Sequence, residues 1–200
     1  MKETPTTQLE RVLLRKGSSI VIGIDEVGKG AWAGPLMIGA AVLSRDVIAS
    51  DDAAVLMGGA RDSKQLSEMR REEMFDHVAA TCAAWSIGYV THAECDALGM
   101  NAAQRLATKR AIESLAKQID VSKATAVIDG RWDFVSPHIS QVVTQVKADA
   151  SVLSVSAASV LAKVSRDRMM REYANDYSLW SFETNKGYPC PKHRTALQGY

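Results

Sequence analysis

IVIGIDEVGKGAWAGPLMIGAAVL, residues 20–43, holds two short apolar runs with a glycine-rich loop between them. The first run covers residues 20–24 and the second covers residues 36–43. Apolar runs of this length, bounded by glycine and proline, predict buried strands rather than helices. We therefore expect two strands joined by a loop that contains Asp25 and Pro35.

The rest of the chain contains helical and strand patterns in mixed order. Three segments have the residues of amphipathic or long helices, the first of them capped by Ser67: 67–80, 102–117 and 151–173. Three further segments have the residues of strands: 84–90, 125–128 and 139–146. Residues 51–62 are rich in Ala, Gly and Asp, and we expect them to be irregular. This mixture predicts an α/β or α+β domain around one sheet.

Length and composition limit the classes of protein. With 200 residues, 46% of them hydrophobic, the chain can bury one core, and we predict a single domain over residues 1–200, with residues 1–18 as an extension. A net charge of +1 means that only a local cluster could hold a nucleic acid. The chain has three cysteines, an odd number, and none are spaced as C-x-x-C, which argues against both a disulfide framework and a zinc knuckle. We find no signal peptide and no membrane-spanning apolar run, and we expect a cytoplasmic protein.

The glycine-rich loop partly matches a phosphate-binding loop. Gly23, Gly28 and Lys29 fit the pattern G-x-x-x-x-G-K-[ST], but Gly30 stands where the pattern needs Ser or Thr. The hydroxyl that would bind magnesium is therefore missing, and the two carboxylates inside the loop would repel a polyphosphate. A nucleotide-binding switch is the disfavoured interpretation.

Asp25 and Glu26 follow a predicted buried strand, where acids need a positive partner. Carboxylate oxygens favour magnesium or manganese over zinc. Because neighbouring side chains on a strand face opposite ways, the pair converges only if the strand ends at Asp25, and the glycines that follow favour such an end. On this pair alone, a solvated turn is the simpler interpretation.

Two other acids occupy comparable positions. Asp129 follows the predicted strand over residues 125–128 and precedes Gly130, and Asp149 lies just before the long predicted helix. Asp149 is equally well explained as a carboxylate that caps the helix N-terminus. Four carboxylates at strand ends and helix starts would suit a two-metal phosphodiester hydrolase, although their spacing in the sequence does not prove that they meet.

Five segments, in this order, resemble the bacterial ribonuclease HII family: GIDEVGKGAWAGP (23–35), DSKQLS (62–67), VIDG (127–130), KADASVLSVSAASVLAKVSRDRMM (147–170) and NKGYPCPKHRTAL (185–197). The resemblance implies a ribonuclease H-like mixed sheet flanked by helices, with a helical C-terminal segment over about 175–200. It also implies that Asp25, Glu26, Asp129 and Asp149 bind two Mg²⁺ or Mn²⁺ ions. Hydrolysis would occur on the 5′ side of a ribonucleotide, in RNA–DNA hybrids or in DNA with embedded ribonucleotides, and would leave 3′-hydroxyl and 5′-phosphate ends.

The same resemblance assigns substrate contacts. Gly28, Lys29 and Gly30 match a G-[RK]-G loop whose backbone approaches the 2′-hydroxyl, and Tyr188 matches a tyrosine that reads the same group. Glycines permit close backbone approach, and a tyrosine offers a ring and a hydroxyl. Backbone phosphate contacts are predicted for five side chains: Ser63, Lys64, Lys163, Arg166 and Arg168. For these five, a turn or solvated surface position is an equally good interpretation. Asp167 is expected to have a structural role.

Several alternatives stay open beside this interpretation. Ribonuclease HIII shares the core, but its additional N-terminal domain does not fit before the first predicted strand. A hybrid-binding protein without hydrolysis is a second alternative, because the chain ends at Tyr200, where relatives generally continue. Trp32 replaces the smaller residue usual in the family, and His193 is expected to pack rather than contact phosphate. We expect a monomer that binds the hybrid or ribonucleotide-containing duplex DNA and no membrane; a replication-associated recruiter is not identified.

Overall fold

The computed structural model describes residues 4–56 and 67–199. Five strands form one sheet in the order β3-β2-β1-β4-β5: β1 (Val21–Val27), β2 (Leu36–Leu43), β3 (Cys82–Val90), β4 (Thr125–Asp129) and β5 (Gln141–Gln145). The helices are α1 (Gln8–Arg15), α2 (Arg45–Ala49), α3 (Ala53–Leu56), α4 (Glu68–Thr81), α5 (His92–Leu98), α6 (Met100–Leu115), α7 (Ala148–Ser151), α8 (Leu153–Asp176), the 3-10 turn η2 (Ser178–Trp180), α9 (Phe182–Asn185) and α10 (Pro191–Gly199). The predicted mixed sheet, the flanking helices and the helical C-terminal segment are confirmed.

The hairpin of β1 and β2 forms the centre of the sheet. β1 pairs antiparallel with β2, and β2 pairs antiparallel with β3. On its other side, β1 pairs in parallel with β4, and β4 pairs in parallel with β5. Because parallel strands have their C-terminal ends at the same edge, the acids near the end of β1 and at the end of β4 lie toward one edge of the sheet.

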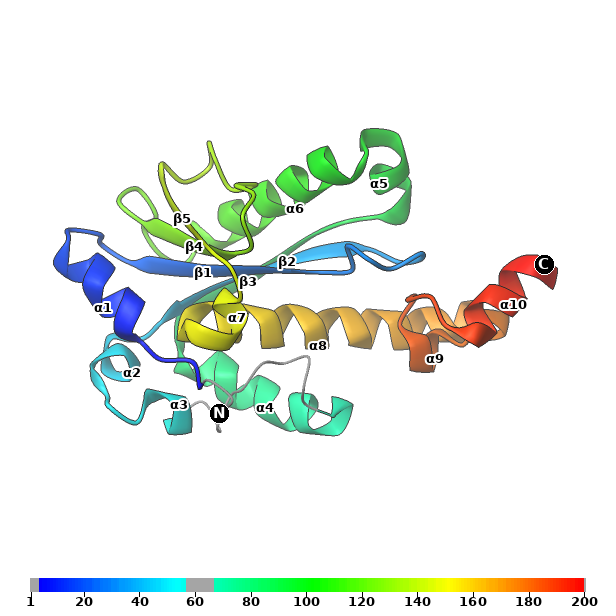
Figure 1. Ribbon diagram of the computed structural model, residues 1–200, viewed down its shortest axis with the longest axis horizontal. Helices are drawn as coiled ribbons and strands as arrows, with labels where there is room; N and C mark the ends of the chain where they lie inside the picture. The colour runs from blue at the N-terminus through cyan, green and yellow to red at the C-terminus, as the bar shows by residue number, and fades with distance from the viewer. Residues whose placement is uncertain (1–3, 57–66, 200) are drawn as a thin grey trace.

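Helices cover both faces of this sheet, with α6 on one face and α8 with α4 on the other (Figure 1). The side chains of β1 alternate accordingly, because Ile22 and Ile24 pack into the core under α6 whereas Val21 packs on the opposite face. Gly23 lets α8 approach closely, since a Cβ there would lie 2.1 Å from the carbonyl carbon of Ser154. Neither α8 nor any other helix in the described ranges is long and apolar enough to cross a membrane.

Local sequence patterns predicted the start of α4 correctly but did not predict the short helices α1 and α3. Ser67 caps α4 as expected, with its Oγ accepting a hydrogen bond of 3.2 Å from the backbone N–H of Arg70. The N-terminal extension, for which no element was predicted, contains α1. Residues 53–56 form α3 within the segment expected to be irregular. Leu9, Leu13 and Leu14 of α1 pack against the core, so tertiary contacts stabilise this short helix.

Candidate active site

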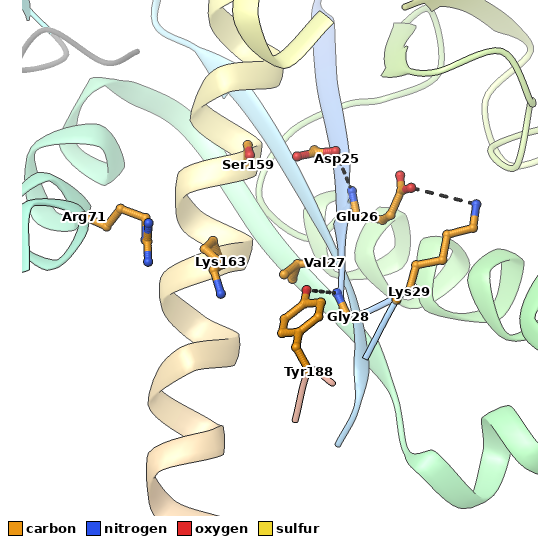
Figure 2. A pocket seen from close by; sticks show the side chains of 10 residues that line it. Asp25, Glu26, Val27, Gly28, Lys29, Arg71, Ser159, Lys163 and Tyr188 are labelled. Carbon is orange, nitrogen blue, oxygen red and sulfur yellow. Dashed lines mark hydrogen bonds and ion pairs between the residues drawn. The ribbon is translucent and has the colours of Figure 1, made fainter. Parts of the chain in front are cut away.

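β1 carries Asp25 and Glu26 to its C-terminal end, but it continues to Val27, where it still pairs with Met37 of β2. The prediction that the strand ends at Asp25 is therefore wrong. The extended backbone turns the two side chains to opposite sides of β1 (Figure 2). Asp25 is only 3% exposed, and its Oδ1 accepts a hydrogen bond of 2.9 Å from the backbone N–H of Glu26.

A cavity of about 460 Å³ opens beside these acids. Its lining comes from β1 and the following loop, from α4 and α8, and from the C-terminal segment: Asp25, Glu26, Val27, Gly28, Lys29, Gly30, Arg71, Ser159, Lys163 and Tyr188. Asp25 lies on the side that faces Ser159 of α8, whereas Glu26 lies toward Lys29, whose Nζ is 3.9 Å from Oε1 of Glu26 (Figure 2). Six of the predicted site residues therefore share one cavity with Tyr188.

Asp129 and Asp149 approach this edge of the sheet through separate elements. Ile24 of β1 lies beside Ile128 of β4, so Asp25 and Asp129 are the next residues on neighbouring parallel strands. Oδ1 of Asp129 accepts a hydrogen bond of 2.9 Å from the backbone N–H of Ala148, the residue before Asp149. Asp149 belongs to α7 and is 6% exposed.

The four acids are nevertheless not gathered into a single compact group. Neither Asp129 nor Asp149 lines the cavity that holds Asp25 and Glu26. Within residues 4–56 and 67–199, no three His, Cys, Asp or Glu side chains lie in a group that could hold a metal ion. The topology thus brings the acids to one edge of the sheet, and the chemistry of the set suits a hard divalent cation because every donor is a carboxylate oxygen.

Basic side chains form the opposite wall of the cavity. Lys163 of α8 donates a hydrogen bond of 2.6 Å to Asp167, whose other oxygen lies 3.6 Å from the guanidinium of Arg71. Burial lowers the pKa of the Lys163 ammonium, and the neighbouring Asp167 opposes that shift. The structural role predicted for Asp167 is therefore confirmed, because it holds two cations at the cavity wall.

Arg71 and Ser159 line this cavity but were missed from the sequence. Both lie in helices, where residues of these types are common on solvated faces. The packing of α4 against α8 brings Arg71 to the cavity. A signal was present only for Ser159, which occurs in the segment over residues 147–170 that resembles the family.

Tyr188 joins the C-terminal segment to the glycine-rich loop. Its hydroxyl oxygen accepts a hydrogen bond of 3.2 Å from the backbone N–H of Gly28. The ring lies 5.5 Å from the ammonium of Lys163 and 5.3 Å from the guanidinium carbon of Arg166. Residues that are 160 positions apart in the chain therefore form one surface at the cavity.

The glycine-rich loop between β1 and β2 packs closely against neighbouring backbone and does not have the connections of a phosphate-binding loop. It joins two antiparallel strands, whereas a phosphate-binding loop leads from a strand into a helix. Gly28 has a φ of +99°, and a Cβ there would lie 2.6 Å from the carbonyl oxygen of Pro35. Gly30 faces open space, so packing within the described chain does not explain that glycine.

The structure gives Arg166 a different role from the predicted one. Its side chain is fully buried, and the guanidinium donates to the carbonyl oxygens of Pro35 at 2.8 Å, Lys186 at 2.7 Å and Ala33 at 3.0 Å. Burial lowers the pKa of this guanidinium. The prediction of a direct phosphate contact is wrong for Arg166, because its hydrogen-bonding capacity serves the backbone of the loop and of the C-terminal segment.

The remaining predictions fall near this region or outside it. Ser63 and Lys64 lie outside the described residues. His193 packs as expected: it is buried, and its Nδ1 lies 3.1 Å from the carbonyl oxygen of Tyr188. Trp32 is 52% exposed and borders a second hollow, of about 510 Å³, together with His193. Trp32 therefore lies beside the cavity of Asp25 and does not line it.

Comparisons with known proteins agree with this geometry. The sequence model of the family described as ribonuclease HII matches residues 22–200. Ribonuclease HII of Streptomyces coelicolor is 39% identical over 199 residues, which cover 98% of this chain and 79% of that protein. The structure of ribonuclease H2 from Pyrococcus horikoshii OT3 is similar with a TM-score of 0.72 at 29% identity, covering 90% of this chain and 86% of that chain. Bst-RNase HIII in complex with Mn²⁺ shares the fold at 19% identity, with a TM-score of 0.63 over 91% of this chain and 70% of that chain.

Proposed function

This chain belongs to the ribonuclease HII family and is a ribonuclease H, and we propose that it cuts on the 5′ side of ribonucleotides in RNA–DNA hybrids and in DNA with embedded ribonucleotides. The expected products carry 3′-hydroxyl and 5′-phosphate ends. The family match over residues 22–200 favours this type over the ribonuclease HIII alternative, whose solved structures share the fold at lower identity.

We assign the binding of two divalent ions to Asp25, Glu26, Asp129 and Asp149. Ribonucleases H depend on divalent metal ions, and for this chain we propose Mg²⁺ or Mn²⁺. When bound by these carboxylates, such ions would supply Lewis acidity for the hydrolysis. The carboxylates of Asp25 and Glu26 lie on the two sides of β1, so the proposed metal sites extend across the end of this strand.

The main support for the proposal is one cavity that is lined both by acids and by the groups proposed to contact the 2′-hydroxyl. Gly28 and the hydroxyl of Tyr188, which are 3.2 Å apart, line the same cavity as Asp25 and Glu26. A 2′-hydroxyl is the group that distinguishes RNA from DNA at a single nucleotide, so its reader must lie beside the reacting phosphate. Lys163 and Arg71 supply positive charge at the cavity wall for substrate phosphates.

Cleavage of a DNA duplex with one ribonucleotide tests this function. In Mg²⁺ or Mn²⁺ we expect one incision 5′ to the ribonucleotide, with mapped 3′-hydroxyl and 5′-phosphate ends, and no incision after chelation of the metal. The matched all-DNA duplex should stay intact, because it lacks the 2′-hydroxyl. Equal cutting of both duplexes would contradict the proposal. Binding without turnover at saturating metal would favour the non-catalytic hybrid-binding alternative.

Replacing Tyr188 by Phe should lower kcat/KM for the single-ribonucleotide duplex by about fivefold, because one hydrogen bond worth roughly 1 kcal/mol is lost. The ring and its contacts with Lys163 would remain, so stability should change little. Tyr89→Phe is the matched control, since Tyr89 is half-exposed on β3 and does not line the cavity. An unchanged kcat/KM in Tyr188→Phe would show that the hydroxyl of Tyr188 does not contribute to recognition of the sugar.

A further inference from the structure

The N-terminal residues hold the junction between α7 and α8. The backbone N–H of Thr6 donates to the carbonyl oxygen of Ser151 at 3.0 Å, and the N–H of Leu153 donates to the carbonyl oxygen of Thr6 at 3.0 Å. Thr6 thus pairs like a short strand with Val152, the residue that separates the two helices. Thr6 lies outside the segment that matches the family model, which begins at residue 22, whereas its partners at the junction lie inside it.

Glu10 of α1 completes this junction from a distant part of the sequence. Its side chain is fully buried, and Oε1 accepts a hydrogen bond of 2.8 Å from the backbone N–H of Ser154 in the first turn of α8. The capping residue Val152 offers no side-chain hydrogen bond to α8. The first N–H groups of a helix lack partners within the helix, so Glu10 supplies an acceptor that the local sequence does not provide.

Burying this carboxylate is costly, which indicates that its position matters. Desolvation raises the pKa of Glu10. Its second oxygen, Oε2, has no hydrogen-bond partner among the described residues. An apolar residue at position 10 would avoid this cost, whereas Glu10 gives a rigid contact between α1 and α8.

The other side of the same junction leads to the acids at the end of β4. Ala148 at the start of α7 donates its backbone N–H to Asp129 at 2.9 Å, and Asp149 follows in the same short helix. Further along α8, Ser159 and Lys163 reach the cavity. The α7–α8 junction therefore has Asp129 on one side and the contact from Glu10 on the other.

We propose that Glu10 is a positioning residue for the metal site: by holding the start of α8, it fixes α7 so that Asp149 and Asp129 can bind one ion together. This inference rests on the proposed assignment of those two acids as metal ligands. Without the hydrogen bond from Ser154 to Glu10, the α7–α8 junction is held less firmly. Binding of the ion then has to fix the position of Asp149, which weakens the binding. Mutation of a residue that orients a metal ligand typically lowers the affinity for the metal by about 10–100-fold.

Direct Mn²⁺ binding, measured by calorimetry without substrate, tests this role. Glu10→Ala should weaken Mn²⁺ binding by about tenfold and raise the Mn²⁺ concentration for half-maximal cleavage by a similar factor, while KM for the duplex at saturating metal stays within about twofold. Glu10→Gln keeps the oxygen acceptor for Ser154 and should bind Mn²⁺ within about threefold of the wild type.

Arg11→Ala is the matched control on the same helix. Arg11 donates to the carbonyl oxygens of Ile48 at 2.6 Å and Ser50 at 2.7 Å, so its loss loosens α1 without touching α8. We expect Arg11→Ala to lower the melting temperature and to leave Mn²⁺ affinity unchanged. If Glu10→Ala does not fold, Glu10→Asp serves instead, because it withdraws the carboxylate by one methylene, and at least a threefold loss of affinity is expected.

Two results would overturn the inference: unchanged Mn²⁺ affinity in the folded Glu10 variant, or an equal loss in Arg11→Ala. Mn²⁺ binding by the Asp149→Asn variant distinguishes an error in the role of Glu10 from an error in the proposed metal site. If Asp149→Asn weakens Mn²⁺ binding and Glu10→Ala does not, the metal site stands and the positioning role is wrong. If Asp149→Asn binds Mn²⁺ like the wild type, the assignment of Asp149 as a ligand fails, and with it the inference.

Discussion

Asp25→Asn is expected to lower kcat on the single-ribonucleotide duplex by at least about a thousandfold. A metal-assisted phosphoryl transfer depends on several kcal/mol of charge stabilisation, and each 1.36 kcal/mol corresponds to a factor of about ten in rate. Asn removes the negative charge that would hold the cation while keeping a similar shape. Its side-chain oxygen can still accept the hydrogen bond that Asp25 now accepts from the N–H of Glu26, so the fold should be retained.

Initial rates at several Mn²⁺ concentrations, together with a thermal melt, measure this effect. Glu113→Gln is the matched control, because it neutralises an exposed acid on α6 that pairs with Lys109 at 3.8 Å and does not line the cavity. The control should keep wild-type kcat. A folded Asp25→Asn variant that retained more than about a tenth of the wild-type rate would contradict the proposed role of Asp25.

Arg166→Met is expected to lower the free energy of unfolding by about 3 kcal/mol or more. Methionine fills much of the volume of the arginine stem but leaves the buried carbonyl oxygens of Pro35 and Lys186, and the partly buried one of Ala33, without the donors that Arg166 provides. Each such buried acceptor costs about 1–3 kcal/mol when its partner is removed. For a chain of this size, the loss corresponds to a fall in Tm of roughly 6–12 °C.

Thermal and urea unfolding measure this loss, with Arg168→Met as the matched control. Arg168 is two positions away on the same helix and pairs with Glu72 at 2.7 Å, but its side chain is 44% exposed. An exposed ion pair contributes at most about 1 kcal/mol, so the control should lose much less stability. Equal losses in the two variants would show that the three carbonyl contacts of Arg166 are not important for stability.

Local patterns were enough to predict the five strands and the three long helices. The apolar runs over residues 20–24 and 36–43 became the central hairpin, because β-branched runs between glycines favour buried strands whatever their partners are. Ser67 was identified as a helix cap because its side chain bonds within the same four residues. The positions of Asp25 and Asp129 at strand ends followed from the same patterns, and the parallel pairing of β1 and β4 placed them at one edge.

The errors occurred where a contact partner lies far along the chain. β1 extends beyond Asp25 because Met37 of β2 continues the ladder, and the local sequence GIDEVG does not contain that partner. Helix α1 was not predicted although Leu9 and Leu13 recur at helical spacing, and a helix of only eight residues depends on their packing on the core. Arg71 was missed for a similar reason, since only the packing of α4 on α8 brings it to the cavity.

The sequence by itself determined the alternation of strands and helices, the acids at the strand ends, and the family to which the chain belongs, because these features depend on neighbouring residues and on motif order. Tertiary structure alone decided which side chains reach the cavity and which are buried. Lys163 and Arg166 are three positions apart on one helix, yet the first lines the cavity and the second bonds to backbone carbonyls. The surroundings of Arg166 come from Ala33 and Pro35, more than a hundred residues away in the sequence, and from Lys186 in the C-terminal segment. Charge and spacing within the helix do not contain that information.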